Sequence, residues 1–375
     1  MAERMEVPSE SRGLRWGICG PGNTAYDFVT AIACLQKGTH VVTAVASRSS
    51  REKAEKMAQD REKFGDWIIC SSLASLERGI YTQYEQLAAD PQVDVVYAGV
   101  THPYRHLVVM AAQASKKPCL VENPMTVTAE MADRLINTAR REKIFLMEAL
   151  WTAFMPAYDF VRDLLKEGKS GPIGQPKLVT CHTGYKERPC LPLHKLKDKG
   201  QSGGAMMDIG IYGLYVAFMA FDGDHPKQVA ACGTLYDTGV DEMVNITLKY
   251  RGNRMAVSTV STNTARPLSE ATIHGTKGWV RLCHPFWCCT KVMIQREDGS
   301  QEEKEFPEDS GRYNFVNSSG LRYQADALRD CFLADNELES SVLPLEASSQ
   351  FRRITDEVRR QLGVQFSEDA GHFKT

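Results

Sequence analysis

The chain has 375 residues, of which 43% are hydrophobic and 25% are charged, and its formal net charge is −2 at pH 7. This length favours two soluble domains, each able to bury a core. The near-neutral charge gives no electrostatic support for nucleic-acid binding, and the lack of any apolar run of about 20 residues argues against a membrane span.

The first predicted strand, 14–19, runs into the pattern Gly20-x-Gly22-x-x-Ala25, and a helix is predicted over 23–37. This pattern between a strand and a helix is typical of a dinucleotide-binding βαβ unit. Gly20 permits the tight turn, Gly22 lets the main chain approach a pyrophosphate, and Ala25 lets the helix pack close to the strand. Taken alone, the glycines are equally compatible with an ordinary turn.

The second predicted strand, 40–46, ends at Ser47-Arg48. An NAD site usually has an acidic residue here, whereas a hydroxyl and a guanidinium suit the 2′-phosphate of NADP. The sequence therefore favours NADP. The alternative is a solvated arginine at a helix start, because Ser49 and Glu52 have the spacing of a capping box.

Two further strands, 93–100 and 119–122, end at Thr101-His102 and at Glu122-Asn123-Pro124. Because the carboxyl ends of parallel strands face one ligand crevice, we expect these residues beside the cofactor. A strand over 144–148 completes the predicted parallel sheet. Between the second and third strands, Asp66–Arg78 has no clean period, and we expect a surface excursion there.

The second half of the chain predicts an antiparallel-rich sheet. Its predicted strands are 178–182, 229–235, 244–250, 255–262, 270–274, 278–283 and 292–295. A buried helix is predicted over 205–221 and a final amphipathic helix over 347–362, stopped by Gly363. The fold class is therefore α/β, with a doubly wound Rossmann domain over 14–148 and an α+β domain with a mostly antiparallel open sheet over 149–375.

The eleven cysteines follow neither a disulfide framework nor a metal-binding spacing, even though Cys288 and Cys289 are adjacent. His102 and His106 have the spacing of a helical metal pair, but Pro103 and the missing third ligand argue against that. We therefore expect no metal and a reducing, cytoplasmic location, since residues 1–12 also lack the apolar core of a secretory signal.

Four motifs occur together in this order: Gly20-x-Gly22-x-x-Ala25, Glu122-x-Pro124, Met147-Glu148-Ala149-Leu150-Trp151 and the run from Gly203 to Tyr212. From Leu14 to Val364 the chain thereby resembles the glucose–fructose oxidoreductase (Gfo/Idh/MocA) family, and within it the dihydrodiol dehydrogenase branch. The resemblance implies NADP-linked oxidation of trans-dihydrodiols, with aldoses such as D-xylose as alternative substrates, and a homodimer formed through the open sheet. The expected cofactor contacts are Gly20, Gly22, Asn23, Ala25, Ser47, Arg48, Thr101, His102 and Glu122.

Asp208 and Tyr212 are four residues apart on the predicted buried helix and therefore share one face. Oxidising an alcohol requires removal of the hydroxyl proton, which a tyrosine can do if its pKa is lowered. The resemblance implies that Tyr212 is the acid–base residue and Asp208 the substrate-orienting carboxylate. The alternative is that Tyr212 only packs in the helix and Asp208 only caps it.

The resemblance also places Trp151 in the substrate pocket. Phe286 or Trp287 is a candidate for another wall of that pocket, and the alternative for either residue is a place in the core. The chain departs from the family at Asn123, where the motif Glu-Lys-Pro has a lysine. A neutral amide does not stabilise a tyrosinate or an alkoxide by charge. Two hypotheses follow: an NADP-dependent dehydrogenase retuned at residue 123, or a catalytically impaired NADP-binding protein.

Overall fold

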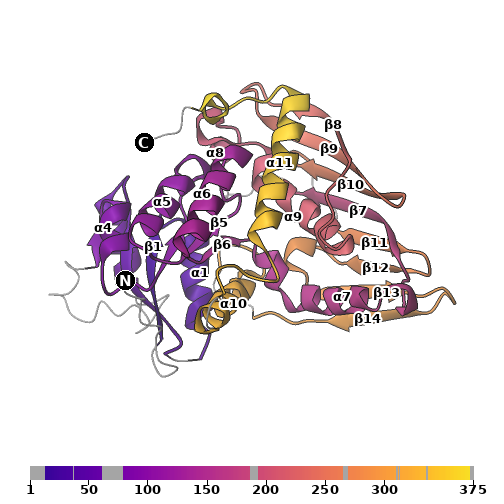
Figure 1. Ribbon diagram of the computed structural model, residues 1–375, viewed down its shortest axis with the longest axis horizontal. Helices are drawn as coiled ribbons and strands as arrows, with labels where there is room; N and C mark the ends of the chain where they lie inside the picture. Colours follow the sequence, from indigo (N-terminus) through magenta and orange to yellow (C-terminus); the bar gives the residue numbers. More distant parts are fainter. Residues whose placement is uncertain are drawn as a thin grey trace.

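The computed structural model describes residues 13–36, 38–60, 79–185, 193–264, 269–309, 311, 313–334 and 337–371. Two sheets lie side by side, with the long helix α11 (Leu345–Leu362) running between them (Figure 1). The predicted excursion Asp66–Arg78 lies outside the described residues. No helix in the described ranges is long and apolar enough to cross a bilayer.

The first sheet is parallel throughout and has the order β3-β2-β1-β4-β5-β6, which confirms the predicted doubly wound arrangement. Its strands are β1 (Leu14–Cys19), β2 (His40–Ala46), β3 (Ile80–Tyr81), β4 (Val95–Ala98), β5 (Cys119–Glu122) and β6 (Leu146–Ala149). Its helices are α1 (Asn23–Ala33), α2 (Arg51–Gln59), α4 (Tyr84–Ala89), α5 (Arg105–Ala114) and α6 (Ala129–Glu142). The strands are buried on both faces, as the β-branched runs predict.

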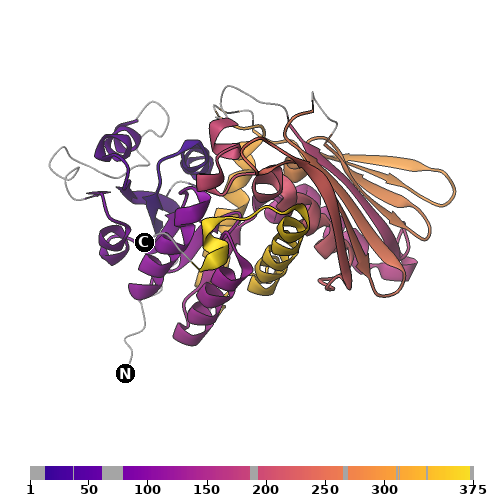
Figure 2. The same cartoon turned by 90° about the horizontal axis from the view of Figure 1, so that it is seen from above.

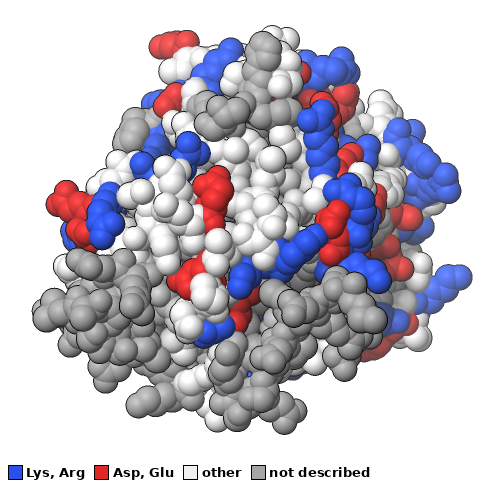
Figure 3. All heavy atoms as spheres, turned by 60° about the vertical axis from the view of Figure 1, so that its left-hand side comes forward, with Lys and Arg blue, Asp and Glu red and all other residues white. Residues whose placement is uncertain are grey.

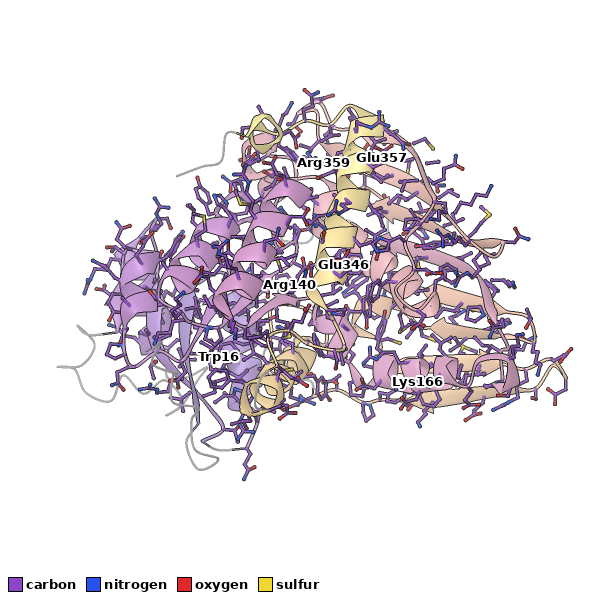
Figure 4. All side chains as sticks on the ribbon, viewed as in Figure 1. Trp16, Arg140, Lys166, Glu346, Glu357 and Arg359 are labelled. Carbon is purple, nitrogen blue, oxygen red and sulfur yellow. The ribbon has the colours of Figure 1, made fainter. Side chains whose placement is uncertain are left out.

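Aromatic packing joins β1 to its neighbours in this half. Trp16, labelled in Figure 4, is fully buried and meets Phe28 of α1 edge to face, with ring centroids 5.0 Å apart. Phe28 in turn stacks on Tyr97 of β4 at 4.3 Å. These contacts fix α1 against the strand end from which the glycine turn leaves.

Two details of the helix predictions were wrong. Helix α1 ends at Ala33 rather than at residue 37, because the N–H groups of Cys34 and Leu35 bond to carbonyls three residues back, which tightens the last turn. Helix α2 is capped by Ser50, whose hydroxyl accepts from the N–H of Lys53, and not by a Ser49–Glu52 capping box.

The second sheet has the order β14-β13-β12-β11-β7-β10-β9-β8 and is antiparallel except where β10 pairs with β7. Its strands are β7 (Pro176–Gly184), β8 (Gln228–Leu235), β9 (Asp241–Tyr250), β10 (Arg254–Ser261), β11 (Ala271–Gly275), β12 (Trp279–Leu282), β13 (Lys291–Gln295) and β14 (Gln301–Glu305). All residues of the edge strand β14 are exposed, in line with its run of charges.

The helices of this half are α7 (Pro156–Lys166), α8 (Leu193–Leu196), α9 (Ala205–Ala220), α10 (Leu321–Leu333) and α11. The predicted buried helix is α9, and α11 ends at Gly363, which adopts the left-handed conformation. Sequence reasoning missed α7 and α10. Helices α7, α9 and α11 cover one face of the sheet, whereas no described helix covers the other face (Figure 2).

Charged side chains are intermixed on the side of the first sheet. In Figure 3, blue and red residues surround a largely uncharged centre. The visible described surface therefore has no extended field of one sign that would attract a polyanion.

Asp241, at the start of β9, caps the N-terminus of α9 from a distance in sequence. Its Oδ2 accepts from the N–H of Met206 at 2.6 Å, and the side chain is fully buried. Burial raises the pKa of this carboxyl from its ordinary 3.8 to about 6. The folded state therefore holds a proton there more tightly than the unfolded chain does.

We expect Asp241 to make a stabilising contribution that is complete below about pH 4 and lost as the pH rises through about 6, roughly 3 kcal/mol in all. Asp241→Asn should therefore remove part of the slope of unfolding free energy against pH in this window. Urea denaturation between pH 4 and 7 measures that slope. Asp237→Asn, on the exposed turn before β9, should leave it unchanged, and equal slopes for both variants would contradict the assignment.

Candidate active site

A cavity of about 680 Å³ opens where the carboxyl ends of β1 and β4 face the N-terminus of α9. Gly22, Asn23, Thr101, His102 and Asp208 line it, which brings together residues predicted from both halves of the chain. The volume lies within the range of small-molecule and cofactor sites. The edge of a doubly wound sheet at its carboxyl ends is also where ligands bind in such folds.

The glycine turn has the geometry that a dinucleotide needs. Gly20 adopts a φ of +87°, and a Cβ there would lie 2.9 Å from the N atom of Val100, so only glycine fits. Gly22 has no atom within 4 Å of its ideal Cβ position and caps α1 without any side-chain hydrogen bond. The N-terminus of α1 is thus open for a pyrophosphate, and a nicotinamide dinucleotide fits these residues. Ala25 is fully buried behind the turn.

The end of β2 lies outside the walls of this cavity. Ser47 is buried, and exposed Arg48 places its guanidinium carbon 5.6 Å from the ring centroid of Tyr84. Lys53 and Lys56 of α2 line the cavity instead. Ser47 and Arg48 as 2′-phosphate contacts therefore stay a prediction, with two lysines nearby that sequence reasoning did not single out.

His102 is held in one orientation. Its Nδ1–H donates to the carbonyl of Ser202 at 3.0 Å, which leaves Nε2 as an acceptor. Burial and the neighbouring Arg105 lower the pKa of His102 to about 3. The imidazole is therefore neutral at physiological pH and acts by hydrogen bonding, not by charge.

The Glu122-Asn123-Pro124 segment does not line this cavity and is joined to it through Arg105, whose Nη1 donates to the carbonyl of Pro124. Glu122 is buried and accepts from the hydroxyl of Tyr97 at 2.6 Å. Asn123 is 9% exposed, and its Nδ2 donates to the carbonyl of Ala149 at 3.0 Å. The amide at the position of the family's lysine is therefore bonded to the main chain of β6.

Asp208 lies in the first turn of α9 and reaches the cavity. Tyr185, at the end of β7, donates to its Oδ2 at 2.5 Å. Burial raises the pKa of Asp208, while this hydrogen bond and the charge of Arg105 oppose the shift. Because its side chain does not cap α9, the helix-cap alternative is wrong for Asp208; Asp241 takes that role.

Tyr212 lies one turn further along α9, inside a frame of two tryptophans. The indole Nε1–H of Trp151 donates to its hydroxyl at 3.3 Å, and its ring stacks on Trp287 with centroids 5.9 Å apart. Burial raises the pKa of Tyr212, and the bond from Trp151 opposes that rise. The surrounding protein therefore does not lower this pKa below its ordinary value. Phe286 is fully buried in the core.

Two groups at the cavity were missed by sequence reasoning. Arg105, the first residue of α5, lines the cavity although it is only 7% exposed. Asn314 and Phe315 reach it from the far end of the chain, where buried Asp27 of α1 accepts from the N–H groups of both residues. Arg105 could have been found, because it lies close after a predicted strand end. The pairing of Asp27 with residue 314 could not, because no pattern in the sequence indicates that contact.

Two family models match the chain. The model described as "Oxidoreductase family, NAD-binding Rossmann fold" matches residues 14–150, and "GFO/IDH/MocA C-terminal domain" matches residues 159–281. Proteins named trans-1,2-dihydrobenzene-1,2-diol dehydrogenase from Danio rerio and Homo sapiens are 37% and 34% identical over 357 residues. Each alignment covers 95% of this chain and 99% of the relative.

A solved structure shows the same fold over nearly the whole molecule. The aldose–aldose oxidoreductase from Caulobacter crescentus, in complex with glycerol, superposes with a TM-score of 0.75. The two sequences are 20% identical, and the match covers 94% of this chain and 98% of that chain.

Proposed function

The chain belongs to the Gfo/Idh/MocA family of NAD(P)-dependent oxidoreductases, and we propose that it is an NADP-dependent dehydrogenase of trans-dihydrodiols and of aldoses such as D-xylose. The observation that carries this proposal is the pair Asp208 and Tyr212, one turn apart on α9. Asp208 lines the cavity together with Gly22, and the hydroxyl of Tyr212 accepts from the indole of Trp151. Relatives with the dihydrodiol dehydrogenase name support the substrate class.

The proposed reaction removes a hydride from the carbon of the alcohol and a proton from its hydroxyl. Bound NADP supplies the nicotinamide ring that accepts the hydride. Tyr212, as tyrosinate, takes the hydroxyl proton, and the bond from Trp151 favours that ionised form. Asp208, which Tyr185 holds in place by a hydrogen bond, accepts from a neighbouring hydroxyl of the substrate. Trp151 and Trp287 wall the substrate, whereas Phe286 supports them from the core.

We propose NADP as the preferred cofactor because no acidic residue lies at positions 47–51, directly after β2. Four polar or basic groups lie there or nearby on α2: Ser47, Arg48, Lys53 and Lys56. Arg48→Ala should weaken NADP binding by about 10-fold relative to NAD, since a charge-assisted bond to the 2′-phosphate is lost. Titration calorimetry with both cofactors measures the ratio. Arg51→Ala, which removes an arginine paired with Glu55, is the control. Equal binding of NAD and NADP to the unmodified protein would refute the preference.

We also propose a homodimer through the uncovered face of the second sheet, where Leu235, Met243 and Met255 are exposed. Light scattering at micromolar concentration should give twice the chain mass of 41.9 kDa, and Met255→Glu should shift it toward the monomer. A monomeric mass for the unmodified protein would contradict the proposal. We further propose that the boundary between the two domains lies between residues 148 and 149, at the end of β6. A cytoplasmic location is also part of the proposed function.

The test of the proposed function is a panel of trans-dihydrodiols and aldoses, with NADPH formation followed at 340 nm. Turnover of a diol or of D-xylose is the expected result. Tight NADP binding without turnover of any alcohol would instead support the impaired protein that the neutral Asn123 suggests.

A further inference from the structure

The guanidinium of Arg105 is fixed against the segment that lacks the family's lysine. Its Nε donates to the carbonyl of Val100 at 3.0 Å, and its Nη1 donates to the carbonyl of Pro124 at 2.8 Å. Val100 follows β4, and Pro124 is the residue next to Asn123. The two bonds therefore span the carboxyl ends of adjacent strands and hold the charge beside position 123.

The third nitrogen of Arg105 is available to a ligand. Within the described residues, the two hydrogen bonds of the Arg105 guanidinium leave from Nε and Nη1, and none leaves from Nη2. Arg352 differs, because its Nε and Nη2 are sealed from solvent without a partner. Arg105 lines the cavity together with Asp208 and His102, so Nη2 is a donor on the cavity side.

Three carboxylates and one further buried guanidinium, that of Arg352, lie close enough to Arg105 to interact with it electrostatically. Asp208, Glu122 and Glu148 all interact electrostatically with its guanidinium. Its charge opposes the burial-driven rise in the pKa of Asp208 and of Glu122. A cation in this position favours the ionised form of the carboxylates and an oxyanion in the cavity.

We propose that Arg105 supplies the fixed positive charge of the reacting end, in place of the lysine that the family has at position 123, and donates from Nη2 to the oxygen of the substrate. This inference rests on the proposed function for the identity of that oxygen. It implies that Asn123 marks a relocated charge and not a lost one. The amide is free to bond to Ala149 because the cation enters from α5 instead.

The test is a charge swap between positions 105 and 123. Arg105→Gln should lower kcat on the best substrate of the panel by about 10²-fold, the usual effect of losing one donor to a developing oxyanion. Asn123→Lys alone should change kcat less than about 5-fold, since a cation is already present. In the Arg105→Gln background the same lysine should regain at least about 10-fold, because the charge returns to the same cavity.

A binding measurement makes the test independent of turnover. D-Xylonate, a sugar carboxylate, serves as the anionic probe of the NADP complex, and protein fluorescence reports its Kd. We expect Arg105→Gln to raise the Kd for D-xylonate about 10-fold and Asn123→Lys in that background to restore it. If the swap governs xylonate binding while no alcohol is turned over, the proposed function fails and the charge assignment stands.

Arg359→Gln is the matched control. Arg359 is a buried guanidinium on α11, labelled in Figure 4, that pairs with Asp356 and Asp369 away from the cavity. The Arg359→Gln variant should have a lower free energy of unfolding but an unchanged kcat. Arg105→Lys, which keeps the charge, covers the case in which the glutamine variant does not fold and should retain xylonate binding within about 3-fold. The proposal would be overturned if Arg105→Gln left kcat and the Kd for D-xylonate unchanged, or if Asn123→Lys did not reverse the losses that Arg105→Gln causes.

Discussion

Tyr212→Phe is expected to lower kcat for alcohol oxidation by at least about 10²-fold, because it removes the hydroxyl that exchanges the substrate proton. The pKa of Tyr212 is raised by burial, so the phenol form prevails at neutral pH. Oxidation by the unmodified protein should therefore accelerate as the pH rises, since the tyrosinate fraction grows. The variant should lose this pH dependence together with its rate.

The control for this prediction lies on the same helix. Tyr215→Phe removes a hydroxyl that accepts from Arg162 of α7 instead of from Trp151, so kcat and its pH profile should be unchanged. NADP binding by calorimetry should be equal in all three proteins. A Tyr212→Phe variant with full activity, or with an unaltered pH profile, would show that another group transfers the proton.

Gly204→Ala should destabilise the protein by about 3 kcal/mol and also reduce kcat strongly. Gly204 has a φ of +117°, and a Cβ there would lie 2.2 Å from Oδ1 of Asp241. Alanine therefore strains the main chain and displaces the carboxylate that caps α9. Since α9 carries Asp208 and Tyr212, a shift of its first turn misplaces both groups.

Gly239→Ala is the control that separates the effect of backbone strain from the effect of displacing the Asp241 carboxylate. Gly239 also has a positive φ, +82°, but no atom lies within 4 Å of its ideal Cβ position. That variant should lose only about 1 kcal/mol and keep its kcat. Urea denaturation measures both losses, and equal values for the two variants would refute the role assigned to Gly204.

The sequence by itself determined the parallel sheet, the glycine turn and the pair on α9. These features depend on local patterns: β-branched runs that end at small residues, a positive φ that demands glycine, and four-residue spacing on one helix face. They also carry the family resemblance, which the matched models confirm. The predicted bounds of α9 and α11 differ from the observed bounds by one and two residues. The bound of α1 differs by four residues, because a tighter last turn ends that helix early.

Only the tertiary structure decided how the reacting groups are charged. Burial keeps His102 neutral and raises the pKa of Tyr212, whereas the sequence specified only that a basic tyrosine needs a lowered pKa. The cap of α9 comes from Asp241, and a cation reaches position 123 from Arg105 through the carbonyl of Pro124. Such effects depend on desolvation and on contacts between residues far apart in the chain, and no local pattern in the sequence encodes them.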